Sequence, residues 1–386
     1  MNDLKEKSLN LHIGGKIEIK SKVKLEDKND LALAYSPGVA YPCLEIAKDK
    51  ELAYKYTAKS NTIAVITDGS AVLGLGNIGP DAAMPVMEGK CLLFKKFANV
   101  DAVPICIKAN DTEELINTIK NIAPSFGGIN LEDIAFPKCV EVETRLAEEL
   151  DIPVFHDDQK GTAVVTVAAL INAARLVGKP LNTLTIAMSG FGSAGSSIAK
   201  ILKKIGVKTI YATNRKGIIS KAKINDYDKV LVDMIEKGII DSFDIKDNDS
   251  LAEIVKGADV FIGVSVADVL TVEMINTMND KPIVFALANP NPEIKYEEAK
   301  KSKAYIIATG RSDYPNQINN VLAFPGIFRG ILDARYKKIT DEMCINASYA
   351  IANLIKDEIN PEYIIPSVFD DRVALAVRKA IIETGE

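Results

Sequence analysis

The chain has 386 residues, 47% of them hydrophobic and 26% charged, which excludes a disordered protein and favours two folded domains. A net charge of -5 argues against a nucleic-acid or anionic-membrane partner. No uninterrupted apolar run reaches the roughly 18 residues of a membrane span, and the first residues carry mixed charges unlike a signal sequence. We therefore expect a cytoplasmic protein that acts on a small molecule.

The five cysteines are scattered through the chain without a C-x-x-C pair. Their number is odd and their spacing fits neither a disulfide framework nor a zinc site. We assign them no chemistry.

From residue 61 onward, apolar runs of strand length alternate with amphipathic stretches, a pattern typical of parallel α/β units. The predicted fold class is α/β, with an N-terminal α/β domain over 1–161 and a Rossmann-type domain with a doubly wound parallel sheet over 162–386. Two helical patterns end the chain, and they could pack back on either domain. The apolar runs lie at 62–69, 100–111, 181–190, 208–214, 258–265, 281–292 and 304–310.

The pattern G-x-G-x-x-G occurs twice, at 74–79 and at 190–195. The second copy follows a predicted strand, opens a helix and leads to another strand, so it completes a βαβ unit that can hold a dinucleotide pyrophosphate. The first copy is followed by Pro80 and Pro85, which we expect to interrupt any long helix, so it is interpreted as a turn or a substrate-facing loop. The predicted cofactor-binding residues of the second copy are Gly190, Gly192, Ser193, Ala194 and Gly195.

The end of the second strand of this βαβ unit carries Asn214 and Arg215 where an NAD-specific protein places an acid. Asparagine removes the carboxylate that repels a 2′-phosphate, and arginine offers a cation. The pattern favours NADP over NAD as the cofactor, although Arg215 and Lys216 also fit ordinary solvated turn residues.

Carboxylates form two pairs at the edges of apolar runs, Glu132 with Asp133 and Asp157 with Asp158. Either pair alone fits surface acids. Together, such groups would repel one another unless a cation lay among them, and oxygen ligands select Mg²⁺ or Mn²⁺. The chain has only two histidines, which disfavours zinc and an imidazole base.

Seven motifs in order resemble the malic enzymes, specifically the short bacterial and archaeal type. They extend from Tyr35 to about Arg329 and read YSPGVAYP, ITDGSAVLGLGNIGPDAAMPVMEGK, NLEDIAFPKC, IPVFHDDQKGTA, SGFGSAG, FALANPNPE and NQINNVLAFPGIFRG. The resemblance implies metal-dependent oxidative decarboxylation of L-malate to pyruvate and CO2 with reduction of NAD or NADP, and it implies a homodimer.

The same resemblance implies roles for individual residues. Lys90 matches the general base and Tyr35 the general acid, while Asp157 matches the acid beside the lysine. We expect burial and a nearby dication to lower the pKa of Lys90 toward neutrality. The implied metal ligands are Glu132, Asp133 and Asp158, and the implied substrate or nicotinamide contacts are Asn289, Asn319 and Asn320.

One position departs from larger family members, which carry an arginine for a malate carboxylate where this chain has Ala71. The cation or donor for that carboxylate stays open among the backbone of 74–79, Ser70, Arg311 and Arg329. Two alternatives to the main reading also stay open. One is malolactic decarboxylation to lactate without net redox change, and the other is a silent NAD(P)-binding regulatory module.

Overall fold

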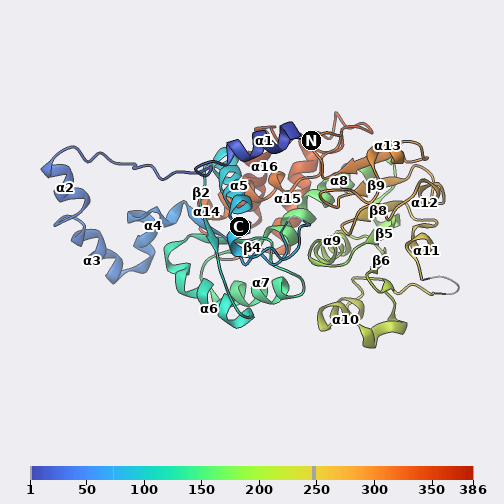
Figure 1. Ribbon diagram of the computed structural model, residues 1–386, viewed down its shortest axis with the longest axis horizontal. Helices are drawn as coiled ribbons and strands as arrows, with labels where there is room; N and C mark the ends of the chain where they lie inside the picture. The colour runs from blue at the N-terminus through green and yellow to red at the C-terminus, as the bar shows by residue number, and fades with distance from the viewer. Residues whose placement is uncertain (1, 73, 246–248, 386) are drawn as a thin grey trace.

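The computed structural model describes residues 2–72, 74–245 and 249–385 and divides into two α/β domains with an arm at one end (Figure 1). The N-terminal domain has strands β1 Thr62–Thr67, β2 Asp101–Cys106, β3 Gly128–Leu131 and β4 Val154–His156, and helices α5 Pro80–Ala98, α6 Thr112–Ile122 and α7 Lys138–Glu149. Before it lie α1 Asn2–Leu11, α2 Lys28–Ala34, α3 Ala40–Lys48 and α4 Ala53–Tyr56.

The N-terminal sheet is parallel, in the order β2-β1-β3-β4. Because side chains alternate along a strand, β1 supplies both faces of the sheet: Ile63 and Val65 join the core that contains α5, and Ala64 and Ile66 join the core that contains α6 and α7. Both faces are therefore covered, as a parallel sheet requires.

Helix α5 corrects one expectation, because it runs for 19 residues from Pro80 and contains Pro85. Pro80 occupies the first turn, where the missing N–H is not needed for an intrahelical bond. The carbonyl of Pro85 accepts a hydrogen bond from Nζ of Lys16 at 2.6 Å. Pro80 therefore begins a long helix, and Pro85 does not interrupt it. This helix carries Lys90.

The second domain contains a sheet in the order β10-β9-β8-β5-β6-β7, parallel except for the edge strand β7. The order runs outward in both directions from β5, which confirms the doubly wound Rossmann-type fold. Such sheets bind ligands where the order reverses, at the carboxyl ends of the strands. The elements are α8 Thr162–Val177, β5 Thr185–Ser189, α9 Ser193–Lys204, β6 Thr209–Asn214, β7 Gly217–Ile218, α10 Lys229–Glu236, α11 Leu251–Val255, β8 Val260–Gly263, α12 Val272–Asn276, β9 Ile283–Ala286, α13 Tyr296–Ala299 and β10 Ile306–Thr309.

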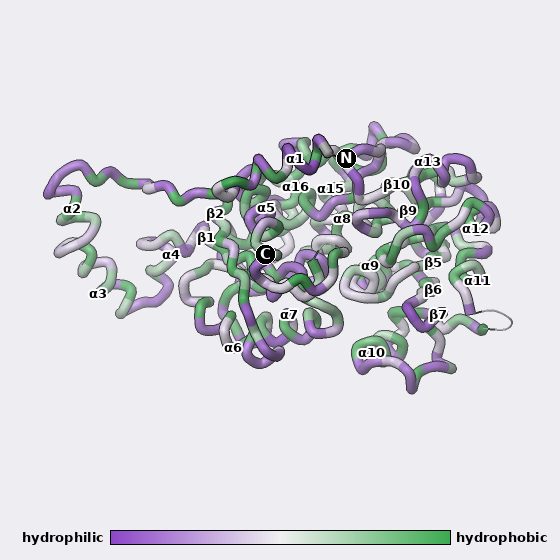
Figure 2. The backbone as a smooth tube through the Cα atoms, viewed as in Figure 1, coloured by the Kyte–Doolittle hydropathy of each residue, from purple (hydrophilic) through white to green (hydrophobic). Residues whose placement is uncertain are grey.

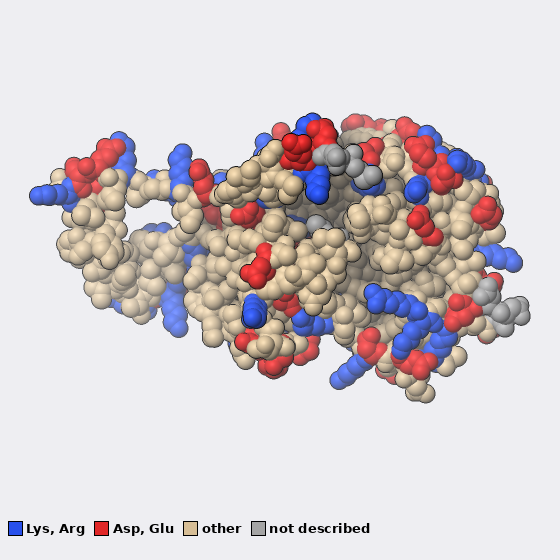
Figure 3. Space-filling view, viewed as in Figure 1, with Lys and Arg blue, Asp and Glu red and all other residues tan. Residues whose placement is uncertain are grey.

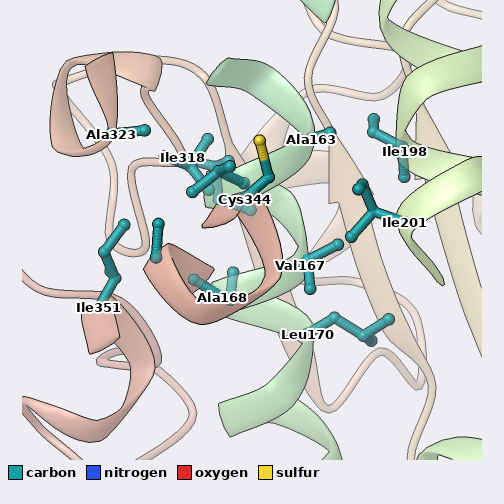
Figure 4. Close-up of a cluster of buried hydrophobic side chains, with 14 of the residues drawn as sticks. Ala163, Val167, Ala168, Leu170, Ile198, Ile201, Ile318, Ala323, Cys344 and Ile351 are labelled. Atoms are coloured by element: carbon teal, nitrogen blue, oxygen red, sulfur yellow. The ribbon is translucent and has the colours of Figure 1, made fainter. Parts of the chain in front are cut away.

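The final helices, α14 Phe324–Ala334, α15 Asp341–Asn353 and α16 Arg372–Thr384, pack back on the rest of the molecule as the sequence allowed. Phe324 and Phe328 of α14 lie against Phe94 of α5, with ring centroids 4.7 and 5.3 Å apart. Figure 4 shows α8 between α9 and α15, with Val167 and Leu170 toward Ile198 and Ile201. A single core therefore joins the two domains.

Among the described residues, one helix, Asp157–Val177, is long and apolar enough to cross a membrane by length and composition alone. Its most apolar window has a mean hydropathy of 1.3, and 78% of that window is buried inside the molecule. Most of this helix is α8, which Figure 2 labels within the body of the molecule. Such burial is ordinary for the core helix of a globular protein.

Candidate active site

Lys90 and the predicted acids converge at the carboxyl ends of the N-terminal strands. Glu132 and Asp133 directly follow β3, Asp157 and Asp158 follow β4, and α5 brings Lys90 over the same edge. Residues 157–161 form one turn of π-helix before α8, an insertion that is frequent at functional sites. The structure therefore brings together five of the six residues for which the sequence predicted catalytic or metal-binding roles.

Lys90 lies at the centre of this group, with its side chain only 13% exposed. Its Nζ is 3.2 Å from Oε1 of Glu132, donates to Oδ2 of Asp157, and lies 4.6 Å from the ring centroid of Phe324. Burial lowers the pKa of Lys90, but the charges of Asp157, Glu132 and Asp158 outweigh it and hold the pKa well above its usual value. The expectation of a lowered pKa depends on a dication beside the acids, so it stays a prediction.

The pKa values of the two buried acids are also shifted. Burial raises the pKa of Glu132 well above 4.5, and Lys90 lowers it less than burial and the neighbouring carboxylates raise it. Burial likewise raises the pKa of Asp157. Oε1 of Glu132 also accepts from Nδ2 of Asn130 at 2.7 Å, which fixes the carboxylate in place. One lysine is shared by two fully buried acids, so the group carries an excess of negative charge.

The acids beside Glu132 and Asp157 are held by the backbone. Asp133 has a φ of 53°, an uncommon value for a residue other than glycine, and its N–H donates to Oδ2 of Asp158 at 2.8 Å. Its carbonyl accepts from the N–H of Ala71 at 2.9 Å. The loop after β3 is thereby tied to the loop after β1 and to Asp158, which sets the four carboxylates side by side.

This donor set fits a hard divalent cation. All of its ligating atoms are carboxylate oxygens, and Oδ1 of Asp157 is buried without a hydrogen-bond partner in the described part of the chain. In residues 2–72, 74–245 and 249–385, however, no three His, Cys, Asp or Glu side chains already stand in a coordinating arrangement.

Tyr35 is placed differently from the other predicted catalytic residues. It caps the C-terminal end of α2, and it is 67% exposed. Figure 1 shows α2 and α3 standing clear of the N-terminal sheet and of helix α5, which carries Lys90. Within one chain, Tyr35 therefore does not join the group of acids.

The predicted dinucleotide loop has the backbone shape that the motif requires. Gly190 has a φ of +94°, and a Cβ there would lie 2.7 Å from the carbonyl of Val264. A Cβ on Gly195 would lie 2.3 Å from the carbonyl of Gly190, whereas one on Gly192 would meet no protein atom within 4 Å. Gly192 caps α9, whose first two residues are Ser193 and Ala194. The cap makes no side-chain hydrogen bond, so the first N–H groups of the helix stay open to an anion.

These contacts predict different effects for two substitutions in the loop. Gly195→Ala forces the backbone of the loop apart, so we expect a lower Tm and at least a tenfold weaker affinity for NAD(P)H. Gly192→Ala meets no protein atom, so we expect an unchanged Tm with a similar loss of affinity, because the methyl group occupies ligand space. Thermal unfolding and fluorescence titration with NAD(P)H measure both. Unchanged affinity in Gly192→Ala would contradict this placement of the pyrophosphate.

The turn after β6 has Asn214 partly buried and Arg215 exposed. Oδ1 of Asn214 accepts from the N–H of Lys216 at 2.8 Å, and Asn214 pairs with Gly217 across the β6–β7 hairpin. The Arg215 guanidinium makes no hydrogen bond or ion pair within the described residues. Both side chains stand where the second strand of a Rossmann unit meets the ribose.

The predicted asparagines lie beside two turns, Asn320 near the π-turn and Asn289 near Gly74. A Cβ on Gly161, at the end of the π-turn, would lie 3.4 Å from Cβ of Asn320, and Asn319 caps the short helix that begins at Asn320. A Cβ on Gly74 would lie 2.5 Å from the carbonyl of Asn289. The first glycine-rich segment is therefore a turn, as expected, and Gly74 lies against Asn289 of the second domain. Figure 3 shows a hollow near the middle of this face of the molecule.

The two arginines considered for the malate carboxylate lie in different parts of the structure. Arg329 donates to Oδ1 of Asn61 at 2.6 Å and pairs with Asp333, so it lies at the amino end of β1, away from the acids. Arg311 follows β10 and directs Nη1 to the carbonyl of Pro290, beside Asn289, at 3.4 Å. Arg329 is thus a wrong candidate because it stands at the opposite edge of the sheet.

The sequence did not single out several side chains that line or support the site. Phe324 and Asn130 contact Lys90 and Glu132, respectively. Lys138 contacts Asp68 in the loop after β1, and Oδ1 of Asp68 accepts from the hydroxyl of Ser70 at 2.6 Å. Phe324 and Lys138 both belong to motifs quoted above, so membership of those motifs was the available signal.

Two family descriptions cover most of the chain. The malic enzyme N-terminal domain matches residues 14–147, and the malic enzyme NAD-binding domain matches residues 159–384. The chain is 52% identical to a bifunctional malic/malolactic enzyme of Bacillus subtilis, covering 99% of this chain and 94% of that protein. It is 51% identical to an NAD-dependent malic enzyme of Geobacillus stearothermophilus, covering 99% of this chain and 79% of the other.

A solved structure agrees with these sequences. The crystal structure of an NAD-dependent malic enzyme from Thermotoga maritima superposes with a TM-score of 0.92 at 47% identity, covering 97% of this chain and 98% of the other. Lys90 and the carboxylates around it occupy the edge of the N-terminal sheet, and the glycine loop opens the second domain. The chain belongs to the malic enzyme family.

Proposed function

We propose that the chain catalyses the oxidative decarboxylation of L-malate to pyruvate and CO2, with reduction of NAD or NADP and with Mg²⁺ or Mn²⁺ as the metal. The observation that carries this proposal is the contact of Lys90 with two buried acids beside a third and a fourth carboxylate. A lysine in such a group is positioned to exchange a proton with a substrate hydroxyl, and the carboxylates suit a divalent ion.

The roles of this chain's residues follow from their positions. Glu132, Asp133 and Asp158 would hold the ion, which would polarise the substrate oxygen and stabilise the charge that develops there. With their charge directed to the ion, the acids would raise the pKa of Lys90 less. Lys90 would then accept the C2 hydroxyl proton while Asp157 orients its ammonium form. Asn289, Asn319 and Asn320 would bind the substrate and the nicotinamide.

The malolactic reaction is the second candidate, because the Bacillus subtilis relative is named as both a malic and a malolactic enzyme. The two reactions differ in their products. NMR spectra of ¹³C-labelled L-malate incubated with protein, Mn²⁺ and NAD(P) would show pyruvate and one reduced nicotinamide for each malate consumed. Lactate without net reduction of the nicotinamide would favour the malolactic reaction, and unchanged malate would favour a silent nucleotide-binding module.

We also propose that the turn at Asn214 and Arg215 sets the coenzyme preference. Asn214→Asp keeps the acceptor for the Lys216 N–H but places a negative charge at the expected 2′-phosphate position. We expect the kcat/KM ratio of NADP to NAD to fall at least tenfold, or roughly 1.4 kcal/mol. Arg215→Gln should lower kcat/KM for NADP alone. An unchanged kcat/KM ratio of NADP to NAD in Asn214→Asp would contradict this placement. Two relatives are named as NAD-dependent malic enzymes, so both coenzymes are measured.

The remaining proposals concern the cellular location, the oligomeric state and the partners of the protein. Its net charge of -5 and its likeness to bacterial malic enzymes support a cytoplasmic homodimer that binds neither nucleic acid nor membranes. Sedimentation of the purified protein tests the dimer.

A further inference from the structure

A buried carboxylate on helix α7 contacts both sides of the π-turn 157–161. This carboxylate belongs to Glu143, which is only 6% exposed. Its Oε1 accepts the N–H of His156 at 3.0 Å and lies 3.0 Å from Nζ of Lys160. His156 directly precedes the turn, and Lys160 lies near its end. One oxygen atom therefore holds both sides of the turn that presents two of the four acids.

The ion pair of Glu143 with Lys160 is itself largely buried, with side chains 8% and 19% exposed. Taking two charges out of water costs free energy, and a buried ion pair is often no more stabilising than uncharged residues of similar volume. Its two partners must nevertheless keep a defined distance and direction. Stability of the fold alone therefore does not account for this pair, whereas the position that it gives to the turn does.

The position of the turn determines where its acids stand. A Cβ on Gly161, the last residue of the turn, would overlap Oδ1 of Asp157, so the turn closes directly on that carboxylate. Oδ2 of Asp157 accepts from Nζ of Lys90. Oδ2 of Asp158 accepts from the N–H of Asp133 at 2.8 Å. These contacts reach α5 and the loop after β3, so a shift of the turn would change both of them together.

Helix α7 also reaches the predicted cofactor loop. Cys139 lies about one helical turn before Glu143, so the two side chains share a face of the helix. Sγ of Cys139 lies 3.6 Å from Oγ of Ser193, the first residue of α9. Figure 1 shows α7 beside α9. The helix that holds the acid turn is therefore also in contact with the second domain.

We propose that Glu143 and Lys160 are positioning residues, which hold the two acids of the π-turn in place for the lysine base and for the metal. This inference rests on the proposed function, because that function assigns the acids their roles. Loss of the pair frees the turn and misplaces both carboxylates. Groups that support metal ligands in this way typically contribute 10–100-fold to metal affinity or activity.

The first test is Lys160→Met, which removes the cation and keeps an apolar side chain of similar length. We expect its affinity for Mn²⁺ to fall at least about tenfold, with a lower kcat for malate and an unchanged affinity for NAD(P)H. Electron paramagnetic resonance of free Mn²⁺ gives the metal affinity without turnover. The matched control is Glu141→Gln, an exposed carboxylate of the same helix that pairs with Arg145 at 3.3 Å, and it should change none of these quantities.

A double variant separates positioning from folding. Glu143→Gln with Lys160→Met removes both charges and keeps an acceptor for the N–H of His156. We expect a Tm close to that of wild type, because the desolvation cost of the pair disappears with the pair. The affinity for Mn²⁺ should stay at least about tenfold below that of wild type. Wild-type affinity in this double variant would overturn the positioning role.

The surroundings of the pair allow a chemical rescue. Glu143 and Lys160 line a pocket of about 470 Å³ between α7, α9 and α10. Lys160→Ala lacks the atoms that n-propylammonium supplies, and n-propanol has the same size without the charge. We expect n-propylammonium, and not n-propanol, to restore the Mn²⁺ affinity of Lys160→Ala. Equal restoration by both compounds would show that the position only needs to be filled, and would overturn the role of the charge.

The remaining outcomes distinguish this inference from the proposed function. Lys160→Met that binds Mn²⁺ as tightly as wild type would overturn the inference and leave the proposed function intact. Wild type that neither binds Mn²⁺ nor turns over malate would overturn the proposed function, and the positioning roles with it.

Discussion

Lys90→Met is expected to lower turnover of malate by at least about 10³-fold while NAD(P)H still binds with its normal affinity. The estimate reflects the 10²–10⁴-fold that a positioned proton-transfer group typically contributes. The cofactor loop after β5 makes no contact with Lys90 in the described structure, so its affinity is an internal control. Stopped-flow or steady-state absorbance of reduced nicotinamide gives the rate, and fluorescence titration gives the affinity.

The same variant has a consequence for stability. Removing Lys90 leaves Asp157 and Glu132 buried without their cation, a change that typically costs about 3–5 kcal/mol. Added Mn²⁺ should therefore raise the Tm of Lys90→Met more than that of wild type. Lys96→Met, an exposed position on the same helix, should change neither rate nor Tm. Turnover of Lys90→Met within tenfold of wild type would contradict the assignment of the base.

Glu132→Gln is expected to abolish metal-dependent turnover and yet to stabilise the metal-free protein near neutral pH. The lysine then faces one buried carboxylate instead of two, so the excess negative charge disappears. The amide oxygen can still accept from Asn130. Such a loss of activity with a gain in stability is typical of a residue that serves a function at a cost in stability.

The pH dependence of this effect has a definite sign. The folded pKa of Glu132 lies well above its ordinary value of 4.5, so wild type takes up a proton on folding. The stability of wild type relative to Glu132→Gln should therefore be greatest below about pH 4.5 and should decline as pH rises through the folded pKa. Thermal unfolding in EDTA across this range measures it. A relative stability that rises with pH would contradict a pKa of Glu132 that burial raises.

The sequence predicted the architecture well, because its signals were local. Apolar runs bounded by glycine and proline located the strands, and a complete βαβ unit around 190–195 selected the correct one of two glycine motifs. The acids were predicted to lie together, and they do, because parallel strands place their following residues on one edge.

Other features depend on packing that local patterns do not contain. Pro85 lies inside α5 without ending it, and Arg329 lies at the amino edge because α14 packs back on the first domain. The raised pKa of Lys90 depends on three acids distant in sequence. The position of Tyr35 could not be predicted either, because its motif specifies a role and not where α2 lies relative to the sheet.

The most direct test of this account is the absorbance of reduced nicotinamide when purified protein is given L-malate and Mn²⁺, with NAD and NADP in parallel. We expect reduction of at least one coenzyme that stops on addition of EDTA, returns with excess Mn²⁺ and is absent in Lys90→Met. Reduction that continues in EDTA or in Lys90→Met, or no turnover of malate to any product, would contradict it.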